Sequence, residues 1–142
     1  MIVHLDTSAV AKLVIEEAES AALAEKLDEL ASTGATLLTS ALAETELRRL
    51  ARRVGGLEQS AVTDVLARLT VVDLDRATYR QTGVLPGAAL RSLDALHIAS
   101  ALQVAADLFA TFDRLQEQAA LDAGLTLLSV LEPGGGSTTP NT

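Results

Sequence analysis

Cysteine and tryptophan are absent from this sequence, and only 2% of its 142 residues are aromatic. Without cysteine, a disulfide framework, a thiolate metal site and a cysteine nucleophile are all excluded. Any metal ion must therefore be held by oxygen ligands or by His4 and His97.

Long hydrophobic runs are also missing, since none approaches the roughly 18 residues that a membrane-spanning helix needs. The first residues, Met1 to Thr7, lack the basic start and apolar middle of a signal peptide. We therefore expect a cytoplasmic protein with no membrane partner.

Basic charge is scarce, because 11 basic residues face 19 acidic ones and the formal net charge is −8. This balance argues against a nucleic-acid partner, since phosphate binding normally needs a basic surface. Four arginines nevertheless cluster in one segment, at Arg48, Arg49, Arg52 and Arg53, and local charge can outweigh net charge. The alternative for each arginine is an exposed helix face paired to acids such as Glu44.

What the chain has in quantity is alanine, leucine and valine, and 49% of its residues are hydrophobic. Its length fits one domain. We expect that domain to cover residues 1–131. Residues 132–142 are rich in glycine, serine, threonine and proline, so we expect them to form a flexible tail.

Short apolar runs alternate with amphipathic segments along the domain. Five runs read as strands: Ile2 to Leu5, Thr36 to Leu38, Val71 to Leu74, Leu108 to Ala110 and Leu125 to Val130. Thr39 or Ser40 is placed to cap the helix that follows the second run. The alternation predicts an α/β fold, with a central parallel sheet of about five short strands sandwiched by about seven helices.

Two of the amphipathic segments, Ser20 to Leu30 and Leu57 to Leu69, have wide apolar faces. A small sheet does not obviously cover both faces. We therefore expect the chain to associate with a second copy.

Four acidic residues fall where this fold would gather them. Asp6 and Asp113 each follow a predicted strand, Asp94 begins the apolar helix near residue 90, and Glu46 lies in the helix after the second strand. The carboxyl ends of parallel strands share one edge of a sheet, so all four can converge there. For each aspartate singly, helix capping is the alternative, and Gln116 lies at a capping-box spacing from Asp113.

Capping does not explain Glu46, which falls in the second turn of its helix. Its neighbours Ala43 and Leu50, one turn away, are apolar, and a carboxylate on an apolar stripe needs a partner. Glu44 lies about 200° around the same helix and has Arg48 four residues on, so we expect an exposed ion pair there.

Carboxylates gathered at one point repel one another unless a cation neutralises them. An all-oxygen ligand set suits Mg²⁺ or Mn²⁺. A cation held there can activate water and stabilise an in-line displacement at phosphorus. We therefore predict a nuclease site with Asp6, Asp94 and Asp113 as metal ligands and Glu46 completing the catalytic set.

Four short motifs carry these acids. They are Leu5-Asp6-Thr7-Ser8-Ala9-Val10, Ser40-Ala41-Leu42 with Glu46-Leu47, Leu93-Asp94-Ala95-Leu96-His97-Ile98-Ala99, and Ala110-Thr111-Phe112-Asp113 with Ala119-Ala120 and Gly124-Leu125. In this order they resemble the motifs of PIN-domain ribonucleases, in particular the VapC toxins of bacterial toxin–antitoxin pairs. The resemblance implies a PIN-like fold and an Mg²⁺- or Mn²⁺-dependent endoribonuclease. It also implies an RNA substrate, a homodimer and a cognate VapB-type antitoxin.

Three polar residues near the acids have open roles. His97 lies three residues after Asp94 on the same helix face, which permits proton transfer or support of a ligand, although the sequence favours a core histidine. Ser8 and Thr111 could orient water or a carboxylate, or cap a helix.

The aromatic residues Tyr79, Phe109 and Phe112 are too few and too scattered for a base-stacking surface. We therefore expect all three to lie in the core.

Other protein classes fit less well. A signalling receiver domain needs an acidic pair after the first strand and a lysine after the last, but Asp6 has no acidic neighbour and Lys26 is the last lysine. A dehalogenase-type phosphatase would have a second aspartate where Ser8 stands. The alternative that stays open is a catalytically silent PIN-like domain that serves as a binding partner in a regulatory complex.

Overall fold

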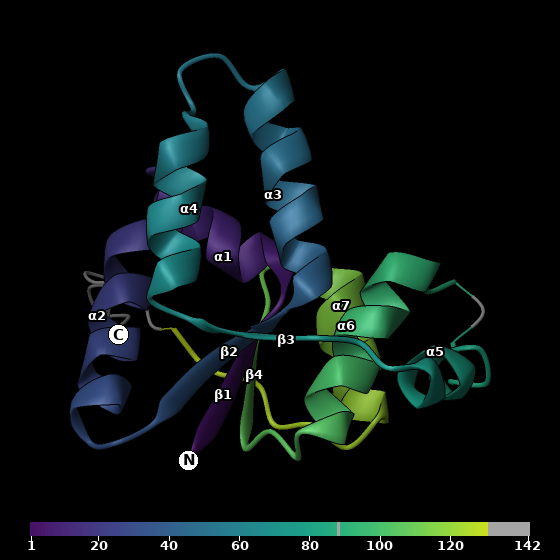
Figure 1. Ribbon diagram of the computed structural model, residues 1–142. Coiled ribbons are helices and arrows are strands. Elements are labelled where there is room, and N and C mark those ends of the chain that lie inside the picture. Colours follow the sequence, from purple (N-terminus) through teal and green to yellow (C-terminus); the bar gives the residue numbers. More distant parts are fainter. Residues whose placement is uncertain (88, 131–142) are drawn as a thin grey trace, which may run out of the picture.

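The computed structural model describes residues 1–87 and 89–130, and its centre is a parallel sheet (Figure 1). Within those residues the sheet has four strands in the order β3-β2-β1-β4. They are β1 (Ile2–Leu5), β2 (Thr36–Ser40), β3 (Thr70–Val72) and β4 (Leu108–Ala110). The predicted parallel α/β fold is therefore confirmed.

The fifth predicted strand, over residues 125–130, does not form as a strand in the described part of the chain. It forms a single parallel bridge, between Leu127 and Phe109. The expected flexible tail over 132–142 lies outside the described residues.

Helices cover both faces of the sheet (Figure 1). They are α1 (Thr7–Val14), α2 (Ser20–Ser32), α3 (Ala41–Arg53), α4 (Gln59–Ala67), α5 (Arg76–Thr82), α6 (Ser92–Gln103) and α7 (Arg114–Asp122). The first four gather on one side of the sheet and the last three on the other. Strand β1 separates two hydrophobic clusters, because alternate side chains of a strand point to opposite faces: Val3 and Leu5 join the first cluster, whereas His4 stacks on Phe109 of the second.

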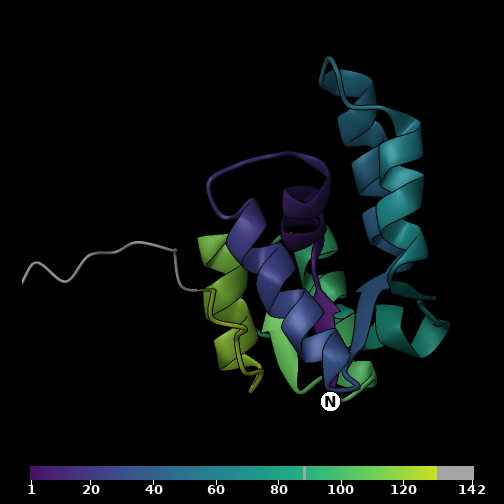
Figure 2. The ribbon, with the colours of Figure 1, turned by 90° about the vertical axis from the view of Figure 1, so that its left-hand side faces the viewer.

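Helices α3 and α4 form an antiparallel pair that rises beyond the carboxyl edge of the sheet (Figures 1 and 2). Arg48 ties the pair together: its Nη2 donates to Glu44 Oε1 at 3.0 Å, and its Nη1 donates to Gln59 Oε1 at 3.2 Å. The predicted Glu44–Arg48 ion pair is thus confirmed.

The apolar faces of α2 and α4 are covered within the chain, contrary to the sequence-based argument for association. Leu23 and Leu27 of α2 are buried, as are Val62 and Val65 of α4. The two helices pack on α1, and α4 also packs on α3. Helical periodicity predicted the apolar faces of α2 and α4 but could not predict that α1 packs against both helices. The argument that these faces need a second copy of the chain was therefore wrong.

The three aromatic residues have different environments. Phe109 is fully buried, as predicted, and Phe112 is half-buried with the Lys12 ammonium 5.3 Å from its ring centre. Tyr79 is 53% exposed, so the prediction that it lies in the core was wrong. Helix α5 buries Thr78 instead, and the adjacent position turns outward.

None of the helices in the described part of the chain is long and apolar enough to cross a membrane.

His4 gives the fold a defined sensitivity to acid. Its Nε2 pairs with Ser100 Oγ at 2.9 Å, and Nδ1 has no partner among the described residues. Burial, with the charge of His97, lowers the pKa of His4 to about 3 from 6.5. Below about pH 6.5, His4 therefore binds a proton in the unfolded chain but stays neutral in the folded chain. This difference lowers the free energy of unfolding by about 1.4 kcal/mol for each pH unit of acidification.

We predict that His4→Gln, which offers an uncharged amide instead of the imidazole, removes this part of the acid sensitivity. Urea unfolding of both proteins between about pH 7 and pH 4 measures it. The stability of the wild type should fall more steeply than that of the variant. Parallel curves would show that His4 is not the responsible group.

Candidate active site

Asp6 lies where β1 ends and α1 begins, and all the contacts of its carboxylate come from neighbouring segments. Its Oδ1 accepts hydrogen bonds from Ser8 Oγ at 2.7 Å and from the Ala9 amide at 3.0 Å. Its Oδ2 accepts a hydrogen bond from Thr111 Oγ1 at 2.6 Å. The two hydroxyls thus orient a carboxylate, which is one of the roles that the sequence left open, and the Ala9 bond caps α1 as well.

Burial and these donors act in opposite directions on Asp6. Burial raises the pKa of the carboxyl, while the hydrogen bonds from Ser8, Thr111 and Ala9 hold the rise back. A carboxylate offers about four lone-pair sites. The donors within the described chain occupy both sites on Oδ1 and one on Oδ2, which leaves one site for a further ligand.

Glu46 has the partners that its apolar surroundings require. Its Oε1 accepts a hydrogen bond from Thr7 Oγ1 at 2.8 Å and lies 2.7 Å from His97 Nε2. Burial alone would raise the pKa of Glu46, but the hydrogen bonds from His97 and Thr7 and the charge of His97 bring it below its usual value. Glu46 is therefore held in place as an ionised carboxylate at neutral pH.

His97 is buried, as the sequence favoured, and it also supports Glu46. Its Nδ1 lies 3.1 Å from Ser40 Oγ, at the start of α3. Both ring nitrogens of His97 therefore have a hydrogen-bond partner, Glu46 at Nε2 and Ser40 at Nδ1.

The helix cap predicted at Thr39 or Ser40 takes a different form. Ser40 is the residue that precedes α3, but its side chain makes no capping bond and turns to His97. Thr39 Oγ1 donates to the Leu5 carbonyl at 2.8 Å. Both hydroxyls thus bond to buried groups of other strands and helices instead of capping α3. The local sequence around Thr39 and Ser40 does not predict these distant partners.

Asp94 and Asp113 form the other half of the site. Asp94 lies in the first turn of α6, and Asp113 caps α7 by accepting from the Gln116 amide at 3.1 Å. The Gln116 side chain does not complete a capping box but donates to the Asp94 carbonyl at 3.0 Å, which joins the two helix starts. Burial raises the pKa of Asp94, and the charges of Asp113 and Glu46 add to the rise.

Asp6 and Asp113 cap the helices that follow β1 and β4, and Asp94 is close enough to Asp113 and Glu46 for their charges to raise its pKa. In the described ranges, no three histidine, aspartate or glutamate side chains lie close enough together to hold a metal ion as they stand. Asp6 and Glu46 each face their own hydrogen-bonding partners. A cation would have to draw the carboxylates inward.

The sequence analysis did not predict the contacts of two residues at the site. Thr7 bonds to Glu46, and Ser40 bonds to His97. Both stand inside the motifs that carry Asp6 and Glu46, so position in a motif was the available signal.

A family model for the PIN domain matches residues 3–121. The chain belongs to the PIN domain family. This confirms the family resemblance of the four motifs.

Curated relatives of this PIN domain are named as ribonucleases. Ribonuclease VapC35 of Mycobacterium tuberculosis is 44% identical over 99 residues, which cover 70% of this chain and 72% of the relative. Ribonuclease VapC46 of the same species is 33% identical over 129 residues, 89% of this chain and 96% of the relative.

Solved structures share the fold of this PIN domain. VapBC2 from Rickettsia felis, bound to a DNA fragment from its promoter, gives a TM-score of 0.74 at 21% identity and covers 90% of this chain and 98% of its own. Mycobacterium tuberculosis VapC20, described as a sarcin–ricin loop cleaving toxin, gives a TM-score of 0.65 at 17% identity. The match covers 92% of this chain and 99% of VapC20.

We predict that Thr111→Val destabilises this PIN domain by about 1–3 kcal/mol, because it removes a hydrogen bond to a buried charged group without changing the shape of the side chain. Urea denaturation at neutral pH measures the loss. Thr36→Val, at an exposed strand position, is the matched control and should stay within about 0.5 kcal/mol of the wild type. Equal effects of the two changes would mean that Thr111 does not stabilise the Asp6 carboxylate.

Proposed function

We propose that this PIN domain is a metal-dependent endoribonuclease and the toxin of a VapBC-type toxin–antitoxin pair. The observation that carries the proposal is the support of its acids: Asp6 and Glu46 are each held by two side chains at the carboxyl edge of the sheet. The VapC names of its relatives supply the substrate class, RNA.

The residues present fit Mg²⁺ or Mn²⁺. The donors are carboxylate oxygens, which these hard cations prefer. Within the described chain, neither Asp6, Asp94 nor Asp113 forms an ion pair with lysine or arginine. The raised pKa of Asp94 reflects burial together with the repulsion that a cation would relieve.

In this proposal Asp6, Asp94 and Asp113 hold the cation, and Glu46 completes the site. When bound, the cation would lower the pKa of water and offset the charge of phosphate oxygens. Ionised Glu46 accepts hydrogen bonds, so it can orient a water molecule for attack on the phosphodiester. His97 and Thr7 keep its carboxylate in position for that task.

The arginines of α3 have separate roles in this proposal. Arg48 is bound to Glu44, so it braces the helix pair. Arg49, Arg52 and Arg53 are exposed and form no ion pair within the described ranges, and they are available to RNA phosphates. Local positive charge would then offset the overall negative charge of the protein.

We predict that Asp6→Asn, Asp94→Asn, Asp113→Asn and Glu46→Gln each lower RNA cleavage roughly 100-fold or more in Mg²⁺ or Mn²⁺. The fold should survive, because Asn and Gln keep the size of the acids and one carbonyl oxygen that accepts hydrogen bonds, and for Asp94 the change also relieves repulsion. Cleavage of a labelled RNA and a circular-dichroism melting curve measure the two effects.

Glu44→Gln is the matched control, the same chemical change two residues from Glu46 on the exposed face of α3. It should leave cleavage unchanged. Asp6→Asn that cleaves at the wild-type rate would refute the metal assignment. A wild type with no metal-dependent cleavage of any RNA would favour the catalytically silent binding partner instead.

The antitoxin partner comes from the family resemblance, and the electrostatics of the acids indicate how it would inhibit. Carboxylates at an open edge attract an arginine or lysine carried on a partner peptide, which would compete with the cation and block RNA. We propose that a VapB-type antitoxin inhibits in this way, as a steric and ionic plug.

We predict that Mg²⁺ raises the apparent dissociation constant of the antitoxin, because both ligands compete for the same carboxylates; at a Mg²⁺ concentration about 10 times its own dissociation constant the rise should be about 10-fold. Titration calorimetry at low and high Mg²⁺ measures it, with ionic strength held constant to separate general screening. An unchanged constant would mean that the antitoxin acts away from the acids.

The homodimer stays a prediction that rests on the family resemblance, since the faces of α2 and α4 do not support it. Light scattering at micromolar concentration should give about twice the chain mass of 14.8 kDa. A strictly monomeric mass would contradict it.

A further inference from the structure

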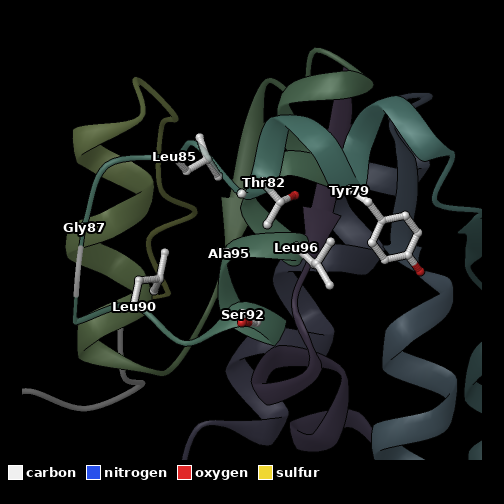
Figure 3. A pocket seen from close by; sticks show the side chains of 9 residues that line it. Tyr79, Thr82, Leu85, Gly87, Leu90, Ser92, Ala95 and Leu96 are labelled. Carbon is white, nitrogen blue, oxygen red and sulfur yellow. The ribbon is translucent and has the colours of Figure 1, made fainter.

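Tyr79 exposes its ring beside a cavity of about 410 Å³ between α5, the segment after it and the start of α6 (Figure 3). Ligand sites of small molecules begin at roughly 300 Å³, so one nucleotide base has room there. The side chains that line the cavity include those of Tyr79, Thr82, Leu85, Leu90, Ser92 and Leu96.

The lining has the chemistry of a base site. Tyr79 offers an aromatic face, and Leu85, Leu90 and Leu96 offer apolar surface. The Thr82 hydroxyl donates to the Thr78 carbonyl at 2.7 Å, so its oxygen can accept a hydrogen bond from the edge of a base. None of the described residues that line the cavity is charged, so it suits an uncharged base rather than a phosphate.

A polar anchor holds α5 against α6. Asp75 Oδ1 accepts from the Thr78 amide and from its hydroxyl, each at 2.8 Å. The Thr78 hydroxyl also bonds to Gln103, whose Nε2 donates to Asp75 Oδ2 at 3.1 Å. Because Thr78 is buried in this network, the backbone of Tyr79 is fixed before any ligand arrives, which lowers the entropic cost of stacking.

The cavity adjoins the acidic site through α6. Ser92 and Ala95 line the cavity, and Asp94 lies between them in the same helical turn. By the helical period, Ser92 and Leu96 point to the side of α6 opposite Asp94. For one of its bases to reach the cavity, an RNA strand with a phosphate at the acids must pass around the start of α6.

We propose that this cavity, the Tyr79 pocket, binds one unpaired base of the RNA substrate by stacking on Tyr79. The proposal rests on the proposed function and adds a base-binding residue, Tyr79, which takes an unpaired base because a paired base cannot leave its stack without cost. Tyr79 is then a specificity-determining residue for the base that follows the RNA strand around the start of α6.

The sequence provides its own probe, because Tyr79 is the single tyrosine and tryptophan is absent. Short single-stranded RNA oligomers of each base should quench the tyrosine fluorescence of the wild-type protein at least twofold, measured with a chelator so that no cleavage occurs. An abasic oligomer of equal length, with the same sugars and phosphates, should not. Equal signals from both oligomers up to millimolar concentration would overturn the pocket.

Cleavage kinetics separate this proposal from the proposed function. Tyr79→Ala should lower kcat/KM on single-stranded RNA roughly tenfold, the order of one lost base stack, and change the preferred cleavage sites. Tyr79→Phe keeps the ring and should restore both. Leu121→Ala, at 52% exposure on α7, is the matched control and should change neither.

The outcomes are distinct. A wild type that cleaves RNA, with Tyr79→Ala cutting the same sites at the same kcat/KM, overturns the pocket and leaves the proposed function standing. A wild type that cleaves no RNA overturns the proposed function, and fluorescence quenching then decides the pocket alone.

Discussion

The burial of the Asp6 carboxylate at the end of β1 is the constraint on which the rest of the structure depends. A buried carboxylate without donors is unstable, and the chain supplies three donors from two segments that are distant in sequence. Thr111 must stand at the end of β4, and Ser8 must stand in the first turn of α1. Ser8 also accepts from the Phe112 amide at 2.9 Å, so the same contacts join β1 to β4 and place Asp113 beside Asp94. Folding and assembly of the site are therefore one event.

Local patterns predicted those features whose partners lie close in the sequence. The strand-to-helix order, the Glu44–Arg48 pair and the need of Glu46 for a partner all follow from spacing along one element. The identity of that partner did not follow, because His97 comes from another helix. The run over 125–130 carries apolar residues suited to a strand, yet Leu127 alone bridges to β4. Whether this run adds a strand to the sheet depends on which backbone N–H and C=O groups of β4 are unpaired, and sequence periodicity does not predict those groups.

The two histidines lie in different environments, although His97 and Ser100, the partner of His4, belong to the same helix α6. His97 lies near the acids, with both ring nitrogens bonded. His4 lies on the opposite side of β1 from Val3 and Leu5, where burial keeps it neutral. The two have the same side chain, but one serves an anionic neighbour and the other packs against Phe109. Residue type alone therefore does not assign a role; the partners around each ring do.

Helix α6 connects the acids to the Tyr79 pocket because it is buried on several sides, as its nearly continuous apolar sequence predicted. Three of its own residues bond to other elements: His97 contacts Glu46, Ser100 contacts His4, and Gln103 contacts Asp75 before α5. Its exposed first turn carries Asp94 on one side and Ser92 on the other. A shift of this helix would move Asp94 together with Ser92 and Leu96, which line the cavity, because all three belong to α6. In our two proposals, the metal ligand and one wall of the base pocket therefore depend on the same helix.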